Sequence, residues 1–455
     1  MSRLVRTLAA LIFLAGAIYA QDRGRRDPKG PAWTSAKVRL IELPDGSPLL
    51  GKIPALPLAP NEDGRFLFGR TDGFKVSIGP KGPLISPYAG GRAVAIEKAG
   101  RTKFQVFTGG KSPAMLPIEF AEKEGAWSYR VPCAIEVTAP QGTVCFLDLD
   151  ADAWFDDLDV DGVAIGPVSA KEPEVTPFTG EVRLGARRFL AFADVDEAGL
   201  WAVSEGLRDD YVRQAAVVNE LRKYALLPAV GLAEDRIAAC EAHSRYCAKH
   251  GLSHPEDPNR PGYSTEGNDA GMKSCLGHGK DAAQATCDML QTLWHRNLYL
   301  SRSLTRVGVG HVEGVLTSDI LTYGQGTDGR TLVYFPPARA LDAELRGATE
   351  NPDPYPEGKE LPGPFVTVLL PPGRNLPLVS GSIAPRGGAP IECATTDPTR
   401  PPAAARERFP DNDRCLVLIP RQALSPETIY DVTIVEGSGK KDQQTFRWSF
   451  RTRRR

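Results

Sequence analysis

Short apolar runs separated by Gly and Pro turns fill the first half of the chain. Runs of β-strand character occur at residues 38–41, 104–107, 134–137 and 189–192. Because such runs between turns are typical of antiparallel sheets, they predict an all-β domain over residues 37–205. Residues 21–36 are charged and rich in turn formers, which predicts a flexible arm ahead of this domain.

The spacing of the apolar residues changes from that of strands to that of helices after Ser204. Residues 211–224 and 233–250 carry helix-forming residues at helical spacing, and Gly251 stands where a C-terminal cap belongs. A third helix is predicted at about 280–293, and β character returns after Gly310, with a strand at 331–335. We assign the mixed segment 208–338 to one domain.

A segment rich in Pro and charge at 339–364 predicts a linker. Beyond it, apolar runs at the spacing of a β-sandwich occur at 365–370, 415–419, 429–435 and 446–451. The strand ends around Tyr430 and Trp448 resemble those of bacterial immunoglobulin-like domains, in which the tyrosine binds backbone upstream. We therefore expect residues 365–452 to form an immunoglobulin-like β-sandwich, a spacer or adhesion module whose Tyr430 and Trp448 belong to the core.

The beginning of the chain has the pattern of a secretory signal peptide. Arg3 and Arg6 precede an apolar run at 8–18, and small residues offer cleavage after Ala17 or Ala20. An uncleaved anchor is the alternative, but the run is shorter than the roughly 20 apolar residues that span a bilayer. We predict a signal peptide over 1–20, no transmembrane segment after cleavage, and a secreted, periplasmic or cell-surface protein.

The charge composition limits the classes of binding partner that we expect. The 455 residues include 55 Lys and Arg against 56 Asp and Glu, a formal net charge of -1. No global positive charge therefore favours nucleic acid, and we expect no nucleic-acid partner.

The chain has 8 cysteines, an even number in a chain with an export signal, so disulfides are the expected state. They group locally as Cys133 with Cys145, Cys240, Cys247, Cys275 and Cys287 together, and Cys393 with Cys415. Cys240 and Cys247 would lie about 10.5 Å apart along one helix, too far to bond each other. Each is expected to pair with Cys275 or Cys287, in either of two ways, and a four-cysteine zinc site is the alternative.

All 6 histidines lie between residues 243 and 311, so a site built on imidazole belongs to the middle domain. This segment also resembles the CAP superfamily, the group of cysteine-rich secretory proteins, antigen 5 and pathogenesis-related proteins, in its bacterial secreted branch. The segments that carry the resemblance are Leu221-Arg222 with Leu227-Pro228, residues 239–246, His250-Gly-Leu-Ser-His254, Glu266-Gly-Asn268, and Trp294-His-Arg-Asn297 followed by Val307-Gly-Val-Gly310.

The resemblance implies an α-β-α sandwich with a cleft lined by two histidines and two acidic residues. It places His254 and His295 in that cleft as metal ligands, with Zn²⁺ as the expected ion, and Glu266 at the position of the first acid. The second acid has no matching Glu, and only Asp281 and Asp288 are available. No organic cofactor is implied.

A second concentration of chemistry lies at residues 148–161, where seven carboxylates fall within fourteen residues. Oxygen ligands in such a row suit Ca²⁺, although the row departs from an EF-hand loop. Asp148, Asp150, Asp152, Asp156 and Asp159 are the candidate ligands of a calcium loop between strands, and a solvated acidic turn is the alternative.

Three functions remain open at this point. The resemblance favours a non-catalytic extracellular protein that binds a lipid, cell-wall or protein ligand. A metal-dependent hydrolase or peptidase would use His254 and His295 for the metal and Glu266 as general base. A purely structural surface or adhesion protein is the third.

Overall fold

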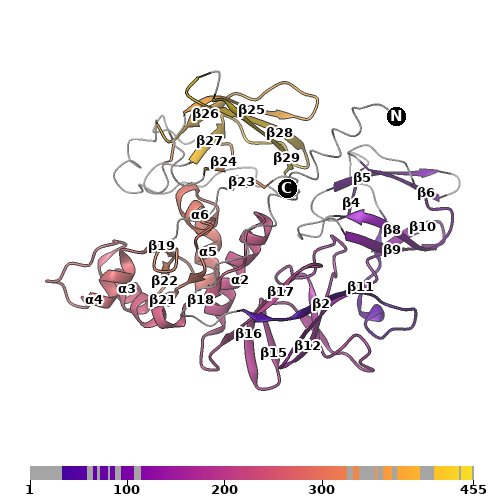
Figure 1. Ribbon diagram of the computed structural model, residues 1–455, viewed down its shortest axis with the longest axis horizontal. Coiled ribbons are helices and arrows are strands. Elements are labelled where there is room, and N and C mark those ends of the chain that lie inside the picture. Colours follow the sequence, from indigo (N-terminus) through magenta and orange to yellow (C-terminus); the bar gives the residue numbers. More distant parts are fainter. Residues whose placement is uncertain are drawn as a thin grey trace.

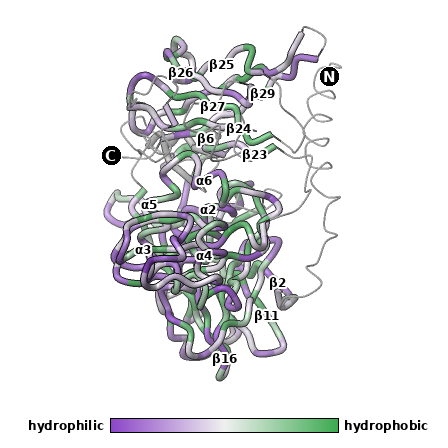
Figure 2. The backbone as a smooth tube through the Cα atoms, turned by 90° about the vertical axis from the view of Figure 1, so that its left-hand side faces the viewer, coloured by the Kyte–Doolittle hydropathy of each residue, from purple (hydrophilic) through white to green (hydrophobic). Residues whose placement is uncertain are grey.

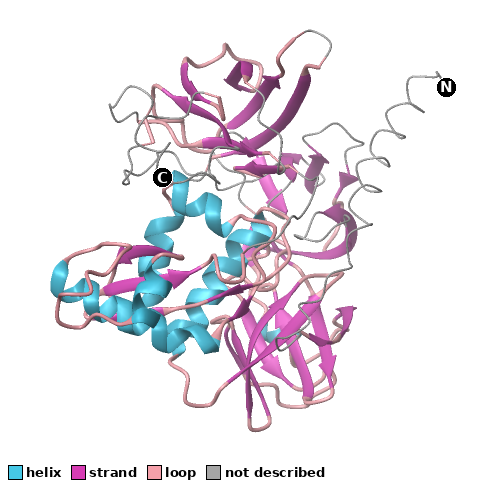
Figure 3. Cartoon of the chain, turned by 60° about the vertical axis from the view of Figure 1, so that its left-hand side comes forward, coloured by secondary structure: helices cyan, strands magenta, loops and turns pink. Residues whose placement is uncertain are grey.

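The computed structural model describes residues 33–58, 65–68, 72–79, 82–87, 94–106, 114–324, 332–337, 354–355, 362–370, 377–399, 415–439 and 442–452. The expected signal peptide, most of the arm and most of the linker lie outside these ranges. Helices gather in a middle lobe, with strand-rich lobes on either side of it (Figure 1, Figure 3). No helix in these ranges combines the length and the apolar character needed to cross a bilayer.

The N-terminal region is built of antiparallel sheets. Three of the predicted runs fall within strands β2 (Lys37–Glu42), β11 (Cys133–Ala139) and β16 (Arg187–Ala193), and the run at 104–107 overlaps β8 (Gly100–Val106) up to its last residue. One sheet contains, in spatial order, β14 (Val175–Pro177), β13 (Gly162–Ile165), β12 (Gly142–Leu147), β11 (Cys133–Ala139) and β2 (Lys37–Glu42). A second contains β1 (Thr34–Ser35), β17 (Ala198–Val203), β16 (Arg187–Ala193) and β15 (Glu181–Leu184). The others contain β3 (Leu56–Pro57), β10 (Ala126–Arg130), β9 (Ala114–Lys123) and β8 (Gly100–Val106), and β4 (Arg65–Phe68), β5 (Asp72–Gly79), β6 (Gly82–Pro87) and β7 (Val94–Ala95).

The end of the expected flexible arm is part of this β region. Thr34 pairs with Leu200 across β1 and β17, and the Trp33 ring lies 5.1 Å from Phe192 and 5.4 Å from Trp201, between ring centroids. The arm prediction is therefore wrong for residues 33–36, because aromatic packing fixes them to the sheet.

The middle lobe places helices on both faces of a small sheet. Its strands are β19 (Ser274–His278), β22 (Val315–Asp319) and β21 (Gly310–Val312), and a parallel pair joins β18 (Gly231–Leu232) to β20 (Arg306–Val307). The helices are α2 (Asp209–Tyr224), α3 (Ile237–His250), α4 (Thr265–Gly271), α5 (Ala282–Leu290) and α6 (Leu293–Tyr299). The three predicted helices correspond to α2, α3 and α5, and Gly251 follows α3 with a φ of 87° as its C-terminal cap.

Two neighbouring residues of β22 show which helix covers each face of the sheet. Thr317 hydrogen-bonds the Ser244 hydroxyl of α3 at 2.9 Å, whereas Ser318 accepts from the Gln214 side chain of α2 at 3.1 Å. Because successive side chains of a strand point to opposite faces, α3 and α2 cover opposite faces of the sheet. Gly310 permits the approach of α3, since a Cβ there would lie 2.3 Å from the Cys240 carbonyl carbon.

The C-terminal lobe consists of two antiparallel sheets. One contains β23 (Val333–Phe335), β24 (Val366–Leu369), β27 (Cys415–Pro420) and β26 (Cys393–Thr396), and the other β25 (Leu378–Pro385), β28 (Ile429–Glu436) and β29 (Gln444–Arg451). Apolar residues of both sheets share one core, and Figure 2 shows hydrophobic stretches along β24 and β27 inside this lobe. All four predicted strands of this region are present.

Two details of this lobe bear on the sequence predictions. The Tyr430 hydroxyl accepts a hydrogen bond from the Ser425 backbone N–H at 2.8 Å, which is the upstream contact expected of this tyrosine. The strand predicted at 331–335, however, belongs to this lobe and not to the middle domain, because β23 pairs with β24 and not with the sheet of the middle lobe. The immunoglobulin-like topology remains a prediction.

A buried ion pair joins the N-terminal region to the middle lobe. The Lys223 ammonium of α2 binds the Asp156 carboxylate and donates to the Ala193 carbonyl at 3.2 Å. It also lies 4.5 Å from the centre of the Trp154 ring. Burial lowers the pKa of Lys223, but the charges of Asp156, Asp157 and Asp194 and the hydrogen bond to Asp156 together raise it more, so the net shift is upward and the ammonium stays charged.

Replacing Lys223 with Met should destabilise the full chain. Asp156 would stay buried without its cation, which costs about 3–5 kcal/mol for a buried pair. Thermal denaturation followed by circular dichroism measures the effect. Lys249→Met is the control, because this lysine is exposed on α3 and should change stability by less than about 0.5 kcal/mol. Equal losses in the two variants would contradict the role given to the ion pair.

Candidate functional site

His254 and His295 belong to different parts of the middle lobe. His254 Nδ1 lies 2.9 Å from the Gly271 carbonyl at the end of α4, and His295 Nδ1 lies 3.0 Å from the Thr292 hydroxyl at the start of α6. Figure 1 shows α4 and α6 well apart. Within the described ranges, no set of three or more metal-ligating groups includes either histidine. The zinc centre expected from the sequence therefore gains no support from this geometry.

The acidic residues of the expected cleft are also dispersed. Glu266 is exposed in the first turn of α4. Asp281 caps α5 by accepting the Gln284 N–H at 2.8 Å, and Asp288 is exposed and accepts from the Gln284 side chain at 2.9 Å. Both aspartates thus interact with their own helix. These contacts do not by themselves bring a general base to either histidine, so the hydrolase hypothesis, which requires a base beside a metal-bound water, stays a prediction.

A different histidine and a different glutamate form a buried pair that the sequence reasoning missed. His243 Nδ1 lies 2.9 Å from Glu256 Oε1, and both side chains are fully buried. Glu256 Oε2 accepts the Ser264 N–H at 2.9 Å, and the Glu256 N–H donates to the Asn268 side chain at 2.8 Å. The pair therefore fixes the loop between α3 and α4 to both helices.

Two glycines of α4 make room for this pair. A Cβ at Gly271 would lie 2.1 Å from a carbon of the His243 ring, and one at Gly267 would lie 2.6 Å from Glu256 Oε1. Both distances are too short for any side chain, so α4 can approach α3 only because these positions are glycine. The Gly-Asn-Asp-Ala-Gly spacing in the sequence is the signal that could have pointed to a buried neighbour.

A pocket of about 290 Å³ opens beside the buried pair. Its lining consists of Tyr246, His250, Gly251, Ser253, Pro255, Glu256, Asp257 and Arg260. The Tyr246 and His250 rings lie 4.6 Å apart between centroids, and Asp257 and Arg260 form an ion pair of 3.5 Å at the exposed side. Charged groups and aromatic faces together suit a polar ligand that carries hydrogen-bonding groups.

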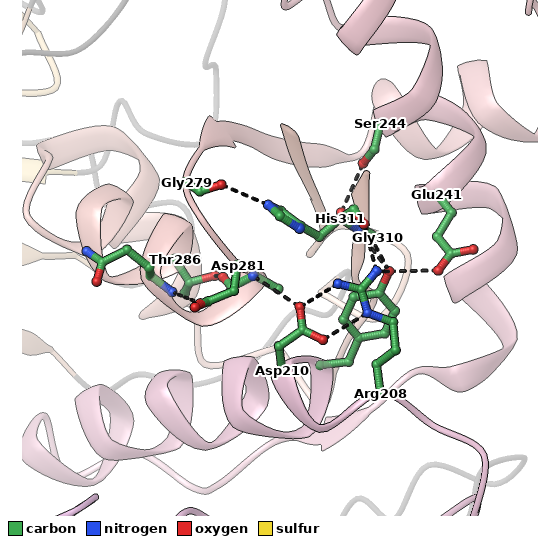
Figure 4. Close-up of polar contacts among 12 residues, drawn as sticks. Arg208, Asp210, Glu241, Ser244, Gly279, Asp281, Thr286, Gly310 and His311 are labelled. Carbon is green, nitrogen blue, oxygen red and sulfur yellow. Dashed lines mark hydrogen bonds and ion pairs between the residues drawn. The ribbon is translucent and has the colours of Figure 1, made fainter. Parts of the chain in front are cut away.

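A polar network at the other side of α3 has a structural role. The Tyr211 hydroxyl donates to Glu241 at 2.7 Å and accepts the His311 N–H at 3.0 Å, and Arg208 donates to the His311 carbonyl at 2.8 Å (Figure 4). His311 Nε2 lies 3.0 Å from the Gly279 carbonyl. Burial, followed by the hydrogen bond to Glu241, raises the pKa of Tyr211. These contacts tie α2, α3 and β21 together.

The acidic loop joins β12 to β13 and divides into two parts. Asp148, Asp150 and Asp152 each offer a carboxylate oxygen, and these oxygens lie within 4.8 Å of one another. The other two candidate calcium ligands are directed elsewhere: Asp156 binds Lys223, and Asp159 binds Arg213. Three of the five candidate ligands therefore lie together, and calcium binding by this loop stays a prediction.

The carboxylates of Asp148 and Asp161 lie in the interior of this loop. Burial, and next the charge of Asp161, raise the pKa of Asp148 well above its ordinary value. Burial, and next the charge of Asp157, raise the pKa of Asp161 to about 9. The upward shifts mean that the crowded carboxylates repel one another in a poorly solvated place.

None of the eight cysteines, all of which lie in the described ranges, forms a disulfide in the structure. Glu136, not Cys133, is the cross-strand partner of Cys145, and Cys133 and Cys145 belong to different cores. Cys393 and Cys415 likewise pack into different cores. Two thiols on opposite faces of a sheet cannot reach disulfide geometry without moving the strands, so both expected pairs are wrong.

The four middle cysteines also have separate surroundings. Cys240 and Cys247 lie on α3, as the sequence predicts. Cys247 contacts His243 Nε2 at 3.4 Å and the Ser253 carbonyl at 3.5 Å, whereas Cys275 belongs to the core under α2. Burial raises the pKa of Cys240 to about 12 and also raises that of Cys287. Thiols with raised pKa values are poor nucleophiles and poor metal ligands at neutral pH.

Comparison with known proteins identifies the middle lobe. Residues 215–322 match the family model CAP, described as the cysteine-rich secretory protein family, so the chain contains a CAP domain. One similar solved structure is that of an extracellular protein containing an SCP domain from Bacillus anthracis str. Ames, with 10% identity and a TM-score of 0.22, over 66% of this chain and 97% of that one. This TM-score is too low to show a shared fold. No curated protein matches the chain.

Substituting Gly271 by Ala should destabilise the CAP domain and distort its pocket. The added methyl would overlap the His243 ring, and forced overpacking of this kind costs about 1–3 kcal/mol. Chemical denaturation of the full chain measures the loss. Gly206→Ala is the control, because nothing lies within 4 Å of a Cβ at Gly206. If Gly271→Ala were as stable as this control, the close contact between α4 and His243 would be refuted.

Proposed function

We propose that this chain is a non-catalytic, extracellular binding protein whose CAP domain holds a polar ligand in the pocket beside the His243–Glu256 pair. The observation that carries the proposal is the lining of this pocket, which includes Glu256, Asp257, Arg260 and His250 around one aromatic face. Such a lining offers hydrogen bonds and charge to a ligand, but little surface to an acyl chain. Among the ligands expected of the family, a cell-wall glycan or peptide fragment fits better than a lipid.

The same geometry argues against a catalytic reaction in the pocket. His243 is buried, and its Nδ1 is occupied by Glu256 while its Nε2 faces Cys247. The expected acid Asp288 interacts with its own helix instead of turning toward a histidine. A general base must reach the proton that it removes. These features favour binding over the hydrolase alternative.

The proposal that the protein is exported depends on the first residues of the chain and on the CAP domain. The signal-peptide pattern over 1–20 and the CAP domain together support export. Strand-rich regions on both sides of the CAP domain support a role as modules that space or attach it in the cell envelope.

Binding of soluble muropeptides to the full chain, measured by calorimetry, tests this function. We expect Arg260→Ala to weaken binding by about tenfold or more, because a hydrogen bond to a charged group contributes about 1.5–3 kcal/mol. Arg245→Ala removes an exposed arginine of α3 outside the pocket and should leave binding unchanged.

Phospholipid vesicles provide the contrasting ligand in the same experiment. Binding to vesicles but not to muropeptides would show that the ligand is a lipid and would contradict the proposal of a polar ligand. Equal effects of the two arginine substitutions would exclude the pocket as the binding site.

A further inference from the structure

We propose that the loop between β12 and β13 binds one Ca²⁺ through the carboxylates of Asp148, Asp150 and Asp152. The site lies in the N-terminal β region and is independent of the CAP pocket. The geometric basis is the convergence of one oxygen from each carboxylate, all within 4.8 Å of one another. Three anionic oxygens at this separation can contact a single cation between them.

Asp148 supplies a second observation that points to a ligand. Its side chain is completely buried, and Oδ2 accepts the Ala153 N–H at 2.8 Å. Oδ1 is also buried but has no hydrogen-bond partner. A buried carboxylate oxygen without a donor is costly, and native structures satisfy such atoms with a protein group, a water or an ion.

The charges around Asp148 favour an ion over a water. The strongest charges acting on it are those of Asp161, Asp152 and Asp150, all negative. A neutral water would hydrogen-bond this oxygen without offsetting that repulsion. A divalent cation would do both, because it supplies positive charge at the point where the carboxylates converge.

Two cationic side chains of α2 bind the other part of the loop. Lys223 binds Asp156 and Arg213 binds Asp159. Asp161 has a backbone role, since its two oxygens accept the N–H groups of Leu149 and Asp157 at 3.0 and 2.9 Å. The remaining cluster is therefore separate from the ion pairs that attach the loop to α2.

The ligand atoms of the site indicate which metal ion it would bind. The group contains oxygen donors only, without His or Cys, which disfavours Zn²⁺. Asp150 is exposed and Asp152 half-buried, so water has access to complete the coordination. Ca²⁺ accepts six to eight oxygens in irregular geometry, whereas Mg²⁺ needs a near-ideal octahedron. We expect a dissociation constant on the order of 10⁻⁴–10⁻³ M, as in extracellular calcium modules.

The site is coupled to the domain interface through Trp154. Asp152 Oδ1 accepts the backbone N–H of Trp154 at 2.8 Å, and the Trp154 ring contacts Lys223 and lies 6.4 Å from the Tyr224 ring. A cation that fixes Asp152 would also fix the side of the loop that packs on α2. Calcium should therefore stabilise the contact between the β region and the CAP domain.

Calorimetric titration of the EDTA-treated full chain with CaCl₂ tests the proposal, using Asp150→Asn/Asp152→Asn as the site variant. Asn keeps the side-chain oxygen that accepts from Trp154 but removes the two charges, so the loop can retain its fold. The control is Glu172→Gln/Glu174→Gln, which removes two exposed charges at the same spacing in the same region. Circular dichroism checks that both variants are folded.

We expect one Ca²⁺ per wild-type and control chain, and affinity about tenfold lower or more in the site variant, because the number of charged ligands tunes calcium affinity. Calcium should also raise the melting temperature of the wild type and control, but not of the site variant. No calcium binding to the wild type, equal binding to the site variant, or binding of Mg²⁺ in preference to Ca²⁺ would overturn the proposal. None of these outcomes affects the muropeptide experiment.

Discussion

Three consecutive residues at the C-terminal end of α2, two cations and an aromatic residue, connect the three regions of the molecule. Arg222 donates to the carbonyls of Pro228, Tyr299 and Ser301, all within 2.8 Å, and so closes the CAP domain around the helix. Lys223 points to the β region and binds Asp156, while the Tyr224 ring packs 6.3 Å from Phe335 of the C-terminal sheet. Positive charge is favourable at this end of a helix, because the helix dipole is negative there.

The periodicity of the chain is sufficient to predict most elements but not their partners. Helices α2 and α3 and the strands around Ala134 or Phe446 follow from local patterns of apolar residues. The assignment of β23 to the CAP domain fails because sequence proximity does not determine sheet pairing. The disulfide expectation fails for a related reason: Cys133 and Cys145 are close in sequence, but the two-residue period of a strand places them on opposite faces.

The candidate sites show the same limit. Counting carboxylates identifies the acidic loop, yet the division of that loop depends on Arg213 and Lys223, which lie more than fifty residues away in sequence. The His243–Glu256 pair is hidden for another reason. His243 lies in a segment that resembles the family, but no sequence pattern links it to Glu256, and the two can approach only because Gly267 and Gly271 have no side chains. A glycine that acts by having no side chain gives only a weak indication of its neighbours in a single sequence.

The burial of His243 also bears on what the CAP domain can do. Imidazole is an effective general base only when a substrate proton lies within hydrogen-bond reach of a free nitrogen. In this domain α4 covers the His243 ring, with Gly271 too close to admit even a methyl group. The pocket is instead lined by Glu256, whose carboxylate already accepts from Ser264. The histidine thus fixes the wall of the pocket from behind, and the ligand meets a rigid, charged surface whose buried groups are occupied with one another.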